Sequence, residues 1–164
     1  GVSITPERRS NLLGDLEELA EADTIVCFDD VAHLALGDPE AQVRIRAINM
    51  LWEAEDRLLV PVFLKMVEGD PDTEVRAAAA SALGKFVFLG ETEELPAEIQ
   101  QNIEDALLLV STGNEPTLVR RRALEALGFS HREEITSLIE QAYKSGEREW
   151  QISALYAMGR SVDP

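Results

Sequence analysis

The chain has 164 residues, of which 45% are hydrophobic and 28% are charged, so it is neither a low-complexity coil nor a membrane-spanning protein. Its 31 acidic side chains outnumber its 15 basic ones, and the formal net charge of −16 disfavours binding to nucleic acid or to an anionic membrane. No Lys or Arg occurs between Arg9 and Arg44, so the N-terminal end is expected to form an acidic pole.

The predicted elements are all helices, and they form a single unit over residues 1–164. An amphipathic helix runs from Thr5 to about Ala20, where Thr5-Pro6 is typical of a helix start. Helical hairpins are then predicted near residues 24–52, 53–85, 97–129 and 133–160. Apolar runs rich in strand-forming residues are isolated, and none has a partner at hairpin distance. We therefore expect an all-α fold.

The second helix of each hairpin is marked by a repeated motif. Residues 37–47 read GDPEAQVRIRA, and 32 positions later residues 69–79 read GDPDTEVRAAA. Alignment of the chain on itself extends this pair to four copies: VRIRAINMLW (43–52), VRAAAASALG (75–84), VRRRALEALG (119–128) and WQISALYAMG (150–159). Each copy has an alanine in the middle of its apolar face, at Ala47, Ala79, Ala123 and Ala154. Small residues there predict that neighbouring helices approach closely.

The ends of these second helices also carry sequence features. Asp38-Pro39 and Asp70-Pro71 place an N-cap acceptor beside a proline, which predicts that the helices start there. Gly84, Gly128 and Gly159 occupy equivalent positions at which we expect each helix to end in a left-handed residue.

One step of the repeat is longer than the others, because an insertion occupies residues 86–97, FVFLGETEELPA. Phe86, Val87, Phe88 and Leu89 are apolar enough to favour burial. We favour the interpretation that they extend the second helix and fill an interhelical gap. The alternative is that they form an edge that faces a partner.

A polar pair recurs together with the apolar pattern. Asp38 and Arg44, Asp70 and Arg76, and Asn114 and Arg120 are each six residues apart. Residues 70–84 carry the motif D-P-x-x-x-V-R-x-x-A-x-x-A-L-G, which resembles the HEAT-repeat family, in particular the short bacterial units found in phycobilin lyases. This resemblance implies an α–α superhelix, a solenoid of the armadillo and HEAT type, in which the six residues form a structural ladder of hydrogen bonds between hairpins.

No residue pattern points to catalysis. The chain lacks a glycine-rich phosphate loop, and Cys27, His33 and His131 are expected to be a core residue and two solvent-facing histidines. We expect no enzyme activity, no metal site and no cofactor. The alternative implied by the resemblance is a phycobilin-lyase-like enzyme or chaperone that acts on a tetrapyrrole-bearing protein.

The function favoured by the sequence is a protein-interaction scaffold. In stacked hairpins the second helices line the inner, concave side, and their positions off the apolar face are expected to face outward toward a protein or peptide partner. The candidate partner-binding residues are Arg46, Asn49, Ser81, Lys85, Arg122, Glu125, Phe129, Tyr156 and Arg160. Ser153 is expected to face outward with them.

The ends of the chain suggest two further expectations. The C-terminal repeat has no polar cap, so we expect a segment of a longer array and self-association through Leu155 and Met158. No secretory signal is recognisable at the N-terminal end, which favours a cytoplasmic location.

Overall fold

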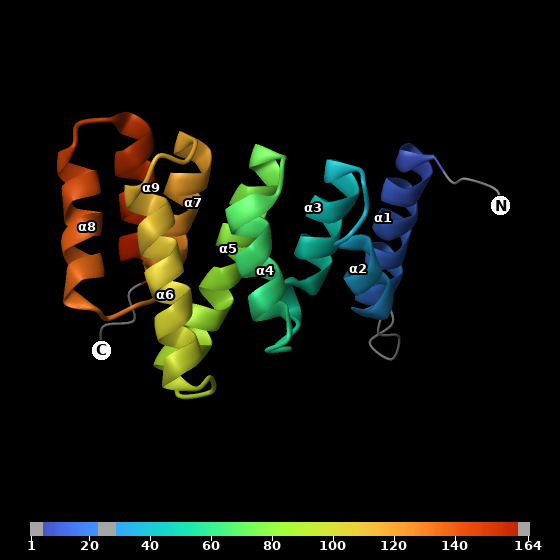
Figure 1. Ribbon diagram of the computed structural model, residues 1–164, viewed down its shortest axis with the longest axis horizontal. Helices are drawn as coiled ribbons and strands as arrows, with labels where there is room; N and C mark the ends of the chain where they lie inside the picture. The colour runs from blue at the N-terminus through green and yellow to red at the C-terminus, as the bar shows by residue number, and fades with distance from the viewer. Residues whose placement is uncertain (1–4, 23–28, 161–164) are drawn as a thin grey trace. The chain divides into compact units, whose positions relative to one another are not determined.

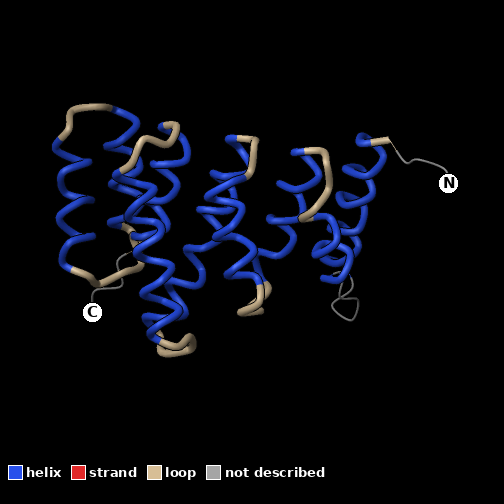
Figure 2. The backbone as a smooth tube through the Cα atoms, in the orientation of Figure 1, coloured by secondary structure: helices blue, strands red, loops and turns tan. Residues whose placement is uncertain are grey.

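The computed structural model describes residues 5–22 and 29–160, and within these ranges it contains helices and turns but no strand (Figure 2). The all-α solenoid class expected from the sequence is confirmed. The chain divides into two compact units, Gly1–Glu55 and Asp56–Pro164. The predicted core position of Cys27 and the predicted start of a helix at Thr24 lie outside the described residues.

The first unit contains α1 (Pro6–Ala22), α2 (Asp29–Ala35), α3 (Ala41–Met50) and the short 3₁₀ helix η1 (Leu51–Glu53). Both α1 and α2 pack against α3, whose Val43 and Ala47 are buried together with Leu13 of α1. Arg9 on α1 forms an ion pair with Asp38 in the turn before α3, at 2.6 Å between Nε and Oδ2. This contact joins the opening helix to the first predicted repeat.

The second unit consists of three helical hairpins: α4 (Leu59–Gly69) with α5 (Thr73–Glu91), α6 (Ala97–Thr112) with α7 (Thr117–Leu127), and α8 (Glu133–Lys144) with α9 (Arg148–Met158). Within it α5 packs against α7, and α7 packs against α9 (Figure 1). Ala79, Ala123 and Ala154 are fully buried in these contacts, so the predicted close approach of the second helices is confirmed.

The helix starts differ in detail from the prediction. The N-cap of α5 is Asp72, whose carboxylate accepts the N–H groups of Glu74 and Val75, and α3 starts after Glu40. Asp70 and Asp38 instead accept the N–H two residues ahead, at 2.9 Å in both turns. The prediction was wrong because these two aspartates close the turn in front of the cap.

Gly84 does not end a helix, because α5 continues to Glu91. A Cβ added to Gly84 would lie 3.2 Å from the Cα of Ala126 on α7, so the glycine provides space for a neighbouring helix. Gly128 and Gly159 do follow the ends of α7 and α9, but both have right-handed helical backbone angles. The expected left-handed helix ends were therefore wrong.

The extension of α5 confirms the favoured interpretation of the insertion for Phe86, Val87 and Leu89, but Phe88 is not buried with them. Phe86, Val87 and Leu89 are buried, and the ring of Phe86 lies 6.5 Å from that of Phe63 on α4. Phe88 is 36% exposed, and its ring contacts that of Phe129, which follows α7. Residues 92–96 of the insertion form the turn into α6.

The turn between α7 and α8 is tied to the extended part of the second unit. The ring Nδ1 of His131, an exposed residue as predicted, lies 2.5 Å from Glu91 at the end of α5. Arg132 pairs with Asp105 and with the buried Glu104 of α6. The hydrogen bond to Asp105 outweighs burial, and with the other carboxylates it raises the pKa of Arg132. The long α5 and α6 are thus connected to the third hairpin by charge-assisted contacts.

Candidate functional site

The residues predicted to bind a partner come together on the second helices of the second unit. Arg122, Glu125 and Phe129 lie on or just after α7, and Tyr156 and Arg160 lie on or just after α9. The spacing of three or four residues places each set on one face of its helix, and the packing of α7 against α9 makes the two faces adjacent.

Arg160 is the centre of this arrangement. Its guanidinium carbon lies 4.8 Å from the ring centre of Phe129 and 4.4 Å from that of Tyr156. Its nitrogens donate to the carbonyl oxygen of Glu125 at 3.0 Å and to the Tyr156 hydroxyl at 3.1 Å. Cation–π contacts and hydrogen bonds therefore hold a cation between two aromatic rings.

Phe88 of α5 completes the group, because its ring meets that of Phe129 edge-on at 5.5 Å between ring centres. We call Phe88, Phe129, Tyr156 and Arg160 the aromatic–arginine cluster. Phe88 is 36% and Tyr156 is 55% exposed, so the cluster presents aromatic surface to solvent. The sequence prediction placed Phe88 in the insertion and did not associate it with Phe129, since the two residues are far apart along the chain.

Glu125 has a different position from the one expected. It is 6% exposed, and its carboxylate accepts the Ser153 hydroxyl at 2.6 Å and Arg122 Nη1 at 2.7 Å. Ser153 is fully buried and also accepts Arg121 Nε at 2.9 Å. The expectation that Glu125 and Ser153 face outward is wrong, because α7 and α9 approach so closely that these positions face each other. Glu125 holds Arg122 and α9 in place beneath the cluster.

The other predicted partner-binding residues are more dispersed. Ser81 and Lys85 are partly exposed on α5, in the same unit as the cluster. Arg46 and Asn49 are exposed on α3, which belongs to the first unit. The second unit thus has cations on α5 (Lys85), on α7 (Arg122) and just after α9 (Arg160), although the chain as a whole is strongly acidic.

In two of the polar pairs predicted to form a ladder, the arginine side chain bonds to the backbone of the aspartate. Arg44 Nη1 donates to the backbone carbonyl of Asp38 at 2.8 Å, and Arg76 Nη1 donates to that of Asp70 at 2.7 Å. Both bonds stay within one hairpin and use the carbonyl oxygen of the aspartate.

The third pair, Asn114 and Arg120, has a different arrangement, since Arg120 Nε donates to the carbonyl of Ser111 at 3.0 Å. A contact between hairpins comes from Arg76, whose Nε lies 3.3 Å from Glu115 Oε2 in the turn between α6 and α7. Glu115 directly follows Asn114, so an acidic neighbour of the predicted position was the available sequence signal.

The described residues include no group of three or more His, Cys, Asp or Glu side chains that could hold a metal ion. No helix in the described ranges is long and apolar enough to cross a membrane.

Comparison with known proteins supports the family resemblance in part. A family model of HEAT repeats matches residues 29–99, which include the motif at residues 70–84. This match supports a HEAT-repeat family for the chain. A search of curated proteins finds no match.

Proposed function

We propose that the chain is a non-catalytic scaffold that binds a protein or peptide segment on the surface of α5, α7 and α9. HEAT repeats commonly serve as protein-interaction scaffolds, and the chain is similar to them over residues 29–99. The observation that carries the proposal is the aromatic–arginine cluster, in which exposed aromatic rings surround a fixed arginine.

The composition of the cluster suits binding. Tyr and Arg are enriched among the residues that contribute most to protein–protein affinity, and large rings bury much area at low entropic cost. Arg160 is already held by Glu125 and Tyr156, so its own side chain loses little freedom when a partner binds. The buried bonds of Glu125 to Ser153 and Arg122 give the cluster a rigid support.

The charges indicate what kind of partner fits. Arg160 lies between the rings of Phe129 and Tyr156, and α5 and α7 of the same unit carry Lys85 and Arg122, in a chain of net charge −16. A partner segment that combines acidic side chains with apolar ones would match both features. Association with such a segment should weaken as the salt concentration rises.

The test compares two tyrosines of similar exposure. Tyr156 in the cluster is 55% exposed, and Tyr143 on α8 is 44% exposed. Partners are captured from extract with the wild-type chain, Tyr156→Ala and Tyr143→Ala, and are quantified by mass spectrometry. We expect Tyr156→Ala to lose at least one partner that Tyr143→Ala retains. Equal capture by both variants, with unchanged melting curves, would remove the cluster from the proposal.

A further inference from the structure

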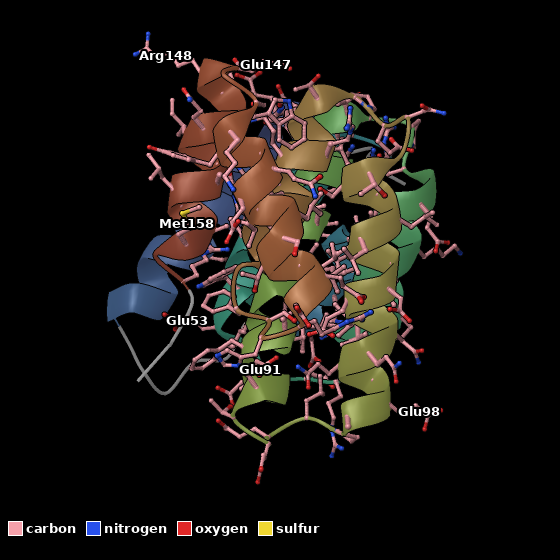
Figure 3. All side chains as sticks on the ribbon, turned by 90° about the vertical axis from the view of Figure 1, so that its left-hand side faces the viewer. Glu53, Glu91, Glu98, Glu147, Arg148 and Met158 are labelled. Carbon is pink, nitrogen blue, oxygen red and sulfur yellow. The ribbon has the colours of Figure 1, made fainter. Side chains whose placement is uncertain are left out.

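The second unit contains a pocket of about 450 Å³ at the end where α6 turns into α7 and α8 turns into α9. Both turns lie at the same end of the hairpins in Figure 1, and Figure 3 labels Glu147 at the turn before α9. The volume is in the range of small-ligand sites. Hydroxyl groups, the guanidinium of Arg120, the ring of Trp150 and the side chains of Leu124 and Leu138 line it. None of the lining residues belongs to the aromatic–arginine cluster.

Arg120 is fixed at this pocket by one part of its guanidinium. Its Nε donates to the Ser111 carbonyl at 3.0 Å, and its central carbon lies 5.1 Å from the ring centre of Trp150. Among the described residues, no hydrogen bond or ion pair involves its two terminal nitrogens. A guanidinium held in this way presents two donors in the geometry that matches a carboxylate.

Ser111 gives a second, independent indication of a ligand. This pocket-lining residue is 2% exposed, and its hydroxyl has no hydrogen-bond partner among the described residues. An unsatisfied buried hydroxyl is unfavourable for folding and calls for an explanation, because nearly all buried polar groups are paired. The oxygen itself is closed off from the open space of the pocket, so a ligand oxygen would accept its hydrogen bond after the side chain turns toward the pocket.

The start of α7 adds positive potential to the same pocket. The helix begins at Thr117, which lines the pocket, and no side chain caps its N-terminus. The first N–H groups of a helix and its dipole favour a negative group. Two features act in the opposite direction: the carboxylate of the exposed Glu147, and the negative C-terminal end of α6, whose last residues Ser111 and Thr112 also line the pocket.

We propose that this pocket binds a carboxylate group, either that of an acidic side chain in a bound peptide or that of a small organic acid. The carboxylate would be bound by the terminal nitrogens of Arg120 beside the Trp150 ring, and the Ser111 hydroxyl would join them once its side chain turns toward the pocket. The site shares α7 and α9 with the proposed partner surface but none of the residues of the aromatic–arginine cluster, so either proposal can fail without the other.

The experiment uses Trp150 as the reporter. The chain has two tryptophans, and Trp52→Phe leaves Trp150 as the only one. The variant is titrated with N-acetyl-glutamate amide, with its neutral glutamine isostere, with acetate as the minimal organic acid, and with inorganic phosphate. We expect saturable fluorescence changes with the glutamate compound and none with the glutamine compound. Saturation by acetate as well would show that the carboxylate group is sufficient for binding and that the rest of the glutamate compound is not needed. Equal responses to both amides, a response to phosphate only, or no response would overturn the proposal.

Three substitutions in the Trp52→Phe background test how binding depends on charge and which side chains contact the carboxylate. Arg120→Lys keeps the charge but removes the two-donor fork, and it should weaken glutamate binding by roughly tenfold or more. Glu147→Gln removes a like charge and should tighten binding. Ser111→Ala removes an unpaired hydroxyl, so it should weaken binding while the unliganded protein melts at the same or a higher temperature. Glutamate affinity that Arg120→Lys and Ser111→Ala leave unchanged would contradict the assignment.

Discussion

Gly128 and Ala157 are in such close contact that a Cβ added to Gly128 would lie 2.6 Å from the Cα and 2.6 Å from the carbonyl oxygen of Ala157. The contact joins the end of α7 to α9 through backbone atoms, which cannot move aside like a flexible side chain. The distance between two hairpins of the second unit therefore depends on the absence of a side chain at Gly128.

Gly128→Ala is expected to destabilise the second unit by about 1 to 3 kcal/mol, because the backbone of α7 or α9 must shift to admit a methyl group. Urea unfolding followed by circular dichroism measures the change. Gly69→Ala at the end of α4 is the matched control, because a Cβ there would have no heavy atom within 4 Å. Equal stability of the two variants would contradict the close contact.

Arg76→Ala should lower stability by about 1 to 3 kcal/mol, the usual loss when a charge-assisted hydrogen bond is removed and its acceptor is left unpaired. The substitution removes the bond to the Asp70 carbonyl and the ion pair with Glu115. Thermal melting measures it, with Arg57→Ala, an exposed position of the same unit, as the control. An unchanged melting temperature for Arg76→Ala would refute the structural role predicted for this arginine.

Asp38→Asn should remove a pH-dependent part of the stability of the first unit. Burial alone would raise the pKa of Asp38, but the hydrogen bonds from Arg9 and from the Glu40 N–H hold it below 3.8. The unfolded chain therefore binds a proton more readily than the folded one. The stabilisation is present above about pH 4 and is lost as the pH falls through the lowered pKa.

The measurement is urea unfolding followed by Trp52 fluorescence in a Trp150→Phe background, since Trp52 belongs to the first unit. At pH 7 the wild-type residue should be more stabilising than asparagine by about 1 to 3 kcal/mol. The difference should shrink in acid below pH 3.8. A difference that is the same at pH 7 and pH 3 would show that the charge of Asp38 contributes nothing.

Leu155→Glu should reduce self-association of the chain. Leu155 and Ile152 on α9 are 55% and 51% exposed, and Met158 is 38% exposed, so this helix presents an apolar face. Multi-angle light scattering over a range of concentrations should show a rising average mass for the wild type and a constant one for the variant. The control Leu109→Glu changes a 75% exposed leucine on α6. A wild-type chain that stays monomeric at high concentration would contradict this prediction.

The helices were predictable because their information is local. The hairpins predicted near residues 97–129 and 133–160 begin where α6 and α8 begin, at Ala97 and Glu133. The buried alanines at 79, 123 and 154 were predictable from the repeat, because each copy has the same small residue where a neighbouring helix packs closely.

Much of the candidate site was accessible in the same way. The spacing of Arg122 and Phe129, and of Tyr156 and Arg160, was enough to place each pair on one helix face. The buried position of Glu125 was not predictable, because a charged residue at an off-core position normally faces water. Its burial depends on Ser153 and Arg122 being close enough to satisfy the carboxylate.

The sequence by itself determined that the chain is helical, where most helices lie and which small residues allow them to pack closely. Only the tertiary structure decided that Gly84 continues a helix, that Phe88 meets Phe129, and that Arg120 and Ser111 meet at one pocket. The physical reason is the distance along the chain over which each effect acts. Hydrophobic periodicity and helix caps act over a few neighbouring residues, whereas these contacts depend on the distances between helices that are remote in the chain.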